Sequence, residues 1–156
     1  MKQYIGTKII KAKPGTMAEA QALRGGMSIE QAKAMFRNSG TVDMDGYVVQ
    51  YEDGYVRWSP KEAFENAYRQ CDNMTFGLAL EALKKGFKVA RMGWNGKNQY
   101  IELASNISYV NADAEIVNCD HEAIGNKAIA FVGTSGVQMG WLASQADMLA
   151  EDWVIC

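Results

Sequence analysis

The alternation of apolar and polar positions divides the chain into two segments, and the first of them mixes short strands and helices. Residues 3–12 are rich in β-branched side chains and predict a strand. Residues 16–24 and 28–37 predict helices, and Ser28 with Gln31 forms the capping box that opens the second. This segment therefore begins as a strand followed by a helical pair.

A hairpin and a third helix complete the first segment. Residues 47–51 and 55–58 predict two strands, and Asp53–Gly54 predicts a type I′ turn between them. Ser59, just before a proline, fits the N-cap of a helix that reaches about Arg69. The short polar run 70–74 then marks a boundary.

The second segment opens with a helix and continues as strands. Thr75 predicts a helix start, and Phe76, Ala79, Leu80 and Leu83 fall on one face. Gly133 to Gly136 predicts a hairpin turn between two of the strands that follow. The predicted strands are 87–92, 99–103, about 106–110, 127–132, 137–141 and 152–155.

These elements predict an α+β protein made of two small modules. Residues 1–70 form the first module and residues 74–156 the second. Each is expected to be a small twisted antiparallel sheet with one or two packed helices, because both mix period-2 strands with short amphipathic helices.

Composition narrows the class of protein. The chain has 156 residues, 48% of them hydrophobic and 22% charged, which is typical of a globular protein with its own core. The net charge of -2 argues against a DNA or RNA binder but leaves room for a small anionic ligand. Three widely spaced cysteines indicate a reducing cytoplasm, and no apolar run predicts a signal peptide or a membrane span.

The residues give little support for catalysis or for a metal. His121 is the only histidine, and the run Cys119 to Glu122 lacks the four-ligand spacing of a zinc site. No third group orients Cys119 and His121 for nucleophilic attack, so we expect no catalytic residue, metal or cofactor. Acid–base chemistry by paired carboxylates stays open, because spacing alone does not exclude it.

Two segments carry the residue types of a nucleotide site. Residues 91–97 combine Arg91, Trp94 and Asn95 with flexible glycines, which suits base stacking and phosphate contact. The alternative is a surface hairpin whose tryptophan packs on the core.

The second of these segments follows Trp141. Ser144, Gln145 and Asp147 offer donors and acceptors at the start of a short predicted helix. The alternative is that Ser144 and Asp147 only cap that helix.

Residues 74–86, 89–97 and 141–153, in this order and at this spacing, resemble the second type of Thoeris anti-defence protein, a small phage and prophage family. The resemblance covers about residues 74–156, with 104–126 the least similar stretch. It implies a sponge for cyclic ADP-ribose isomers, with cyclic dinucleotides as further ligands, and a homotetramer with pockets between subunits. Carried onto this chain, it implies a pocket formed by Phe76, Arg91, Trp94, Asn95, Trp141, Ser144, Gln145 and Asp147.

Two other functions remain open at this point. One is an enzyme that degrades the same signals. The other is a protein–protein interaction module of the phage, in which Tyr47, Tyr51, Tyr55 and Trp58 form a contact face. The role of residues 1–70 does not follow from the sequence.

Overall fold

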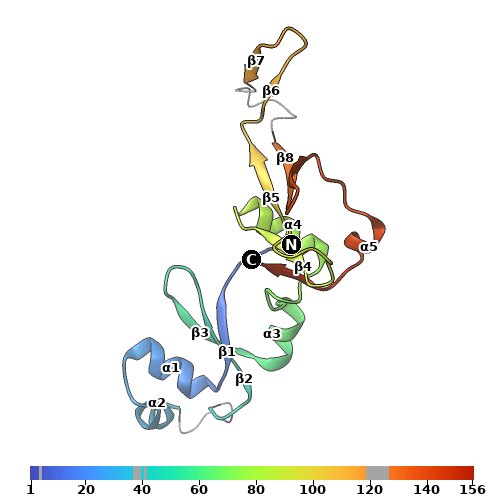
Figure 1. The fold of residues 1–156 in the computed structure, drawn as a ribbon. Helices are drawn as coiled ribbons and strands as arrows, with labels where there is room; N and C mark the ends of the chain where they lie inside the picture. The colour runs from blue at the N-terminus through green and yellow to red at the C-terminus, as the bar shows by residue number, and fades with distance from the viewer. Residues whose placement is uncertain (4, 37–39, 41, 119–126) are drawn as a thin grey trace. The chain divides into compact units, whose positions relative to one another are not determined.

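The computed structural model describes residues 1–156 except 4, 37–39, 41 and 119–126, and it divides into two compact units (Figure 1). The units are residues 1–69 and 70–156. Each contains helices and small antiparallel sheets, so the predicted α+β class is confirmed. None of the helices in the described part of the chain is long and apolar enough to cross a membrane.

The first unit is a three-stranded antiparallel sheet, in the order β1-β2-β3, with three short helices. Its elements are β1 (Lys11–Pro14), α1 (Met17–Gly25), α2 (Ile29–Met35), β2 (Gly46–Gln50), β3 (Val56–Pro60) and α3 (Lys61–Ala67). Both α1 and α2 begin with a full capping box, from Thr16 and Ser28 respectively. The box predicted at Ser28 is therefore confirmed.

Small side chains fill the core of this unit. Ala18, Ala22 and Ala32 are buried where α1 meets α2. A second cluster joins Ala20 of α1 to Val48 and Val56 of the sheet, with Trp58 packed against it. Small residues allow the helices to approach closely, and each buries little apolar area.

The predicted strand 3–12 is wrong over most of its length. Only β1 forms, and its first residue, Lys11, lies opposite Gln50 at the end of β2. The described residues 1–3 and 5–10 are assigned to no strand, and Ile5 is fully exposed. Pro14 belongs to the strand, which an edge position permits.

The β2–β3 hairpin forms as expected, but its turn differs. Tyr51 N donates to Tyr55 O at 2.9 Å, which leaves a three-residue loop. A type I′ turn needs a positive φ at both central residues, but only Gly54, at 82°, has one and Asp53 does not, so the predicted turn type is wrong. Asp53 instead accepts a hydrogen bond from Tyr55 N at 2.9 Å.

The third helix starts one residue later than predicted and stacks aromatic rings on the sheet. Ser59 lies in β3 opposite Tyr47, so Pro60 takes the N-cap position without a side-chain cap. Tyr47 stacks on Phe64 with centroids 4.1 Å apart, and Phe64 on Tyr68 at 4.8 Å. Trp58 lies opposite Val48 and packs against the cluster beneath α1, whereas Tyr47 is the neighbour of Val48 and points to the other face of the sheet. The prediction that Trp58 and Tyr47 share one contact face is therefore wrong.

The second unit is a five-stranded antiparallel sheet in the order β10-β4-β5-β8-β9, with a separate two-stranded pair. Its elements are α4 (Phe76–Lys84), β4 (Val89–Arg91), β5 (Tyr100–Ser105), β6 (Ser108–Val110), β7 (Ile116–Asn118), β8 (Lys127–Gly133), β9 (Gly136–Met139), α5 (Gln145–Met148) and β10 (Trp153–Ile155). The hairpin turn predicted at 133–136 joins β8 to β9 and is confirmed.

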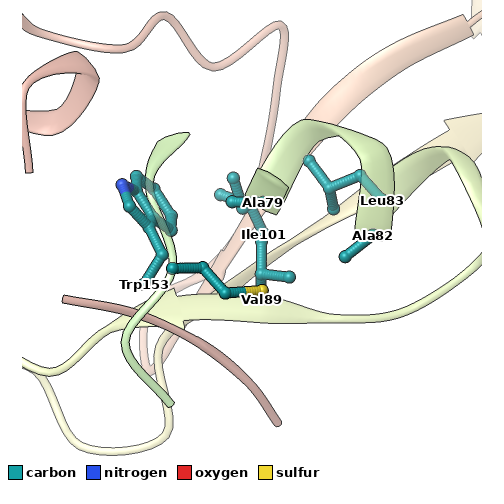
Figure 2. Packing of buried hydrophobic residues seen from close by; sticks show 7 residues of the cluster. Ala79, Ala82, Leu83, Val89, Ile101 and Trp153 are labelled. Atoms are coloured by element: carbon teal, nitrogen blue, oxygen red, sulfur yellow. The ribbon is translucent and has the colours of Figure 1, made fainter. Parts of the chain in front are cut away.

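Helix α4 supplies the centre of this unit's core, as its periodicity predicted. Figure 2 shows Ala79 and Leu83 of α4 beside Val89, Ile101 and Trp153. Trp153 is fully buried and Leu83 is 2% exposed. Thr75 occupies the N-cap of α4, but its side chain makes no capping hydrogen bond, so only the position of that cap was right.

The two-stranded pair β6–β7 lies at the far end of β5 (Figure 1). Strand β6 begins at Ser108 and not at residue 106, because Asn106 adopts a left-handed φ of 54° that interrupts the extended chain. Its partner β7 was not predicted from the sequence.

Candidate ligand-binding site

Strand pairing brings the two segments with nucleotide-binding residue types together. Arg91 of β4 lies opposite Trp153 of β10, although the two are far apart in the chain. The loop after β4 therefore meets the turn that leads from α5 into β10. Met92 N donates to Asp152 O at 3.1 Å and continues the ladder into that loop.

Arg91 lies between two carboxylates. Its Nε donates to Asp152 Oδ1 at 2.8 Å, and its Nη1 donates to Asp147 Oδ1 at 3.0 Å. Nη1 also approaches the carbonyl of Ala146 at 3.3 Å. The three ionised side chains are only 14–28% exposed, so solvent screens these contacts less than it would on an open surface.

Asp147 connects helix α5 to both Arg91 and Trp94. Ser144 donates two hydrogen bonds to Asp147 Oδ2, one from its backbone N at 3.1 Å and one from its Oγ at 2.6 Å. Asp147 N donates to Ser144 Oγ at 3.1 Å, which completes a capping box. Trp94 Nε1 donates to Oδ1 at 3.3 Å. The helix cap that was one reading of Ser144 and Asp147 is confirmed, whereas their contact with a ligand stays a prediction.

The network keeps both carboxyl groups ionised. The hydrogen bond from Arg91 is the main cause that lowers the pKa of Asp152. Partial burial raises the pKa of Asp147, but hydrogen bonds from Ser144 and Arg91 outweigh it and leave this pKa below its ordinary value. The same contacts, with Asp152 first, raise the pKa of Arg91.

Three tryptophans pack edge to face behind the network. The ring of Trp94 lies 5.4 Å from Trp153 and 6.0 Å from Trp141 between centroids. Trp94 also meets Phe131 of β8 at 5.4 Å. Trp153 Nε1 donates to the backbone O of Asp147 at 3.0 Å. Trp94 is thus half-buried against the core, as the alternative reading of its segment predicted.

The remaining predicted site residues divide between the core and the surface. Phe76 packs on Trp153 with centroids 5.4 Å apart and belongs to the core margin. Asn95 and Gln145 are exposed at the edges of the two joined segments, as is Ser144. We use the term rim for Asn95 and Gln145. The structure therefore joins the predicted residues Arg91, Trp94, Ser144 and Asp147, together with Asp152, in one hydrogen-bonded network. Trp141 packs against Trp94, and the rim residues Asn95 and Gln145 lie on the same two segments.

Asp152 is the residue of this network that the sequence did not single out. It lies just before the strand that carries the buried Trp153. An acidic residue at a strand end is common, and its role depends on β10 pairing with β4, which local pattern does not reveal.

The network offers little for a metal or for acid–base chemistry. Within the described ranges, no group of three or more His, Cys, Asp or Glu side chains is arranged to hold a metal ion. Asp147 and Asp152 are already bound by a guanidinium and by backbone donors. Cys119 and His121 lie outside the described residues.

Comparison with known proteins identifies the class of protein to which this α+β unit belongs. Residues 74–156 match the family described as the Thoeris anti-defense 2-like domain, which is more than half of the chain. The chain therefore belongs to the Thoeris anti-defense 2-like family of anti-defence proteins. The resemblance inferred from the motifs is confirmed.

A phage protein is similar to about half of this chain. "Thoeris anti-defense 2" of Bacillus phage SP01 is 41% identical over 87 residues. The match covers 53% of this chain and 93% of the phage protein. The matched part of this chain therefore corresponds to almost the whole of that relative.

Proposed function

We propose that the second unit binds cyclic nucleotide signals of bacterial immunity and sequesters them without cleaving them. Membership of the Thoeris anti-defense 2-like family supports a target in that immune system. The observation that carries the proposal is the rim: the amides of Asn95 and Gln145 are exposed on segments that the Arg91 network holds in place. Amides on segments that are already held can read a base edge or a ribose hydroxyl without the cost of ordering the backbone on binding.

The carboxylates of Asp147 and Asp152 already accept hydrogen bonds, which favours binding over catalysis. A general acid must carry a proton at the working pH, and a general base must be free to accept one. Hydrogen bonds keep the pKa of both Asp147 and Asp152 below the ordinary value, so both are ionised at neutral pH. Their oxygens already accept hydrogen bonds from Arg91, Ser144 and Gly93.

Self-association belongs to the proposal, as a homotetramer whose ligand sites include residues of more than one copy. Leu142 and Leu149 flank α5 and are 88% and 81% exposed in the single chain. Met148 lies between them in sequence and is half-exposed. Apolar side chains gathered this way on a surface are characteristic of interfaces. We place the protein's action in the cytoplasm of the infected bacterium, without DNA, RNA or membrane as partner.

A thermal-shift screen against cyclic ADP-ribose isomers and cyclic dinucleotides tests binding. A ligand at 100 times its dissociation constant adds about 2.7 kcal/mol to the free energy of unfolding, so a clear rise in melting temperature is expected. Absence of any shift across both ligand classes would contradict the proposal.

Variants of the rim locate the site. Asn95→Ala and Gln145→Ala should weaken binding by roughly tenfold each, because one lost hydrogen bond is worth about 1–1.5 kcal/mol. Both residues are exposed, so the melting temperature without ligand should stay near that of the wild type. Asn66→Ala, an exposed amide of α3 in the first unit, is the control and should change neither quantity.

A further inference from the structure

The carboxylate of Asp152 ties together three successive residues of the other segment. Oδ1 accepts from Arg91 Nε at 2.8 Å, and Oδ2 accepts from Gly93 N at 2.9 Å. The backbone O of Asp152 accepts from Met92 N at 3.1 Å. The loop that carries Trp94 and Asn95 therefore starts from a backbone that this one residue holds.

Asp152 is itself held by the core. The next residue, Trp153, is fully buried and pairs with Met74 through two backbone hydrogen bonds of 2.8 and 3.2 Å. The indole of Trp153 also donates to the backbone O of Asp147 at 3.0 Å. A rigid strand end thus presents the Asp152 carboxylate to the loop.

The loop backbone approaches this carboxylate too closely for a side chain to fit comfortably between them. A Cβ added to Gly93 would lie 3.0 Å from Asp152 Oδ2. Gly93 therefore permits the backbone N–H to reach the carboxylate directly. An ion pair needed only for surface charge balance would not require that approach.

We propose that Asp152 is a positioning residue for ligand binding, which holds the Arg91–Gly93 backbone so that Trp94 and Asn95 face helix α5. This inference rests on the proposed function. Asp152 acts through its hydrogen bonds to Arg91 and Gly93 and makes no ligand contact of its own. Loss of its charge releases Gly93 N and frees the Arg91 side chain to turn toward Asp147 alone.

The test compares Asp152→Asn with Glu151→Gln in the full chain. Each variant removes one negative charge, and Glu151 is an exposed neighbour of Asp152. Binding of cyclic ADP-ribose is measured by calorimetry on protein shown by its melting curve to be folded. The chain is also labelled with 5-fluorotryptophan, and the Trp94 resonance is assigned from its loss in Trp94→Phe.

Asp152→Asn should weaken binding at least tenfold and move the Trp94 fluorine resonance, whereas Glu151→Gln should do neither. A residue that only stabilises the fold would lower the melting temperature and leave the affinity of the folded protein unchanged. That result, or an unmoved Trp94 resonance, would overturn the inference.

Two controls keep the outcome clear. If Asp152→Asn does not fold, Asp152→Glu retains the charge and displaces it by one methylene, and it should show the same loss of affinity and the same spectral change. Wild-type affinity in that variant would overturn the inference. A wild-type chain that binds neither cyclic ADP-ribose nor a cyclic dinucleotide would overturn the proposed function instead, and this role with it.

Discussion

Residues 1–69 and residues 70–156 are similar in length, yet they bury side chains of different sizes. The first unit is centred on alanines and valines, such as Ala20, Val48 and Val56. The second unit buries Leu83, Ile101 and Trp153. Larger side chains remove more apolar area from water, so the second unit has the firmer core on which to place polar residues.

The charges of the two units differ in the same sense. Residues 1–69 contain ten Lys or Arg and eight Asp or Glu, whereas residues 70–156 contain six and ten. Two of the acidic residues in the second unit, Asp147 and Asp152, form ion pairs with its only arginine, Arg91. Positive charge is therefore scarce where the ligand is proposed to bind, and we expect hydrogen-bond donors at the rim to carry recognition.

Trp153→Ala should have the largest effect, because it should unfold the second unit and leave the first folded. Truncating a fully buried tryptophan costs about 3–5 kcal/mol, which is enough to unfold a marginal domain. Amide signals of residues 70–156 should collapse in an NMR spectrum while those of 1–69 remain dispersed. Trp58→Ala, which opens the other core, should do the reverse; simultaneous loss of both sets in either variant would show that the units do not fold separately.

Asp147→Ala should come next. It removes the helix cap and the acceptor for both Arg91 and Trp94, so a loss of about 2–3 kcal/mol is expected. Ser144→Ala removes only the reciprocal cap partner and should cost about 1 kcal/mol. Denaturant melts of the two variants measure the difference, and equal losses would mean that the contacts to Arg91 and Trp94 add no stability.

Acidification should weaken the second unit. The pKa values of Asp147 and Asp152 lie below their ordinary values in the folded chain, so the unfolded chain binds protons first as the pH falls. Their contribution is complete above about pH 5 and is lost as the pH drops through the folded pKa values. The melting temperature of the second unit should fall from pH 5 to pH 3 less steeply in Asp152→Asn than in the wild type. Equal slopes would contradict the lowered pKa of Asp152.

Removal of residues 1–69 should have the smallest effect. The family match covers residues 74–156, which lie within the second unit, and about half of this chain covers 93% of the phage relative. We therefore expect the family domain to fold without the first unit. The melting temperature and ligand affinity of residues 70–156 should match those of the full chain. A large drop in either would mean that the first unit supports the site.

Local features of the fold could be read from the sequence because their interactions are local. The capping box at Ser28 and the helix cap at Ser144 each join residues three positions apart; the first was predicted and the second was one of two readings, and both form. The turn at Asp53–Gly54 was located correctly but given the wrong type. Of the strand predicted over residues 3–12, only Lys11 and Ala12 lie in β1, because β2 ends at Gln50, the partner of Lys11.

Only some residues of the candidate site could be predicted from the sequence. Residue type marked the segments of Arg91–Trp94 and of Asp147 separately, and only the family resemblance implied that they share one site; the structure joins them. The sequence left open whether Trp94 packs or binds, because an aromatic ring suits both. Asp152 was missed since its partner, Arg91, is 61 residues away and only the β4–β10 pairing brings them together.

Recovery of intact ligand from the complex tests sequestration most directly. The protein is mixed with a tenfold molar excess of cyclic ADP-ribose, incubated, heat-denatured and cleared, and the supernatant is separated by chromatography. Sequestration predicts that all of the added ligand returns unchanged, including the fraction that was bound before denaturation. Steady loss of several ligand molecules per protein chain, with a new product accumulating, would contradict sequestration and identify the protein as an enzyme.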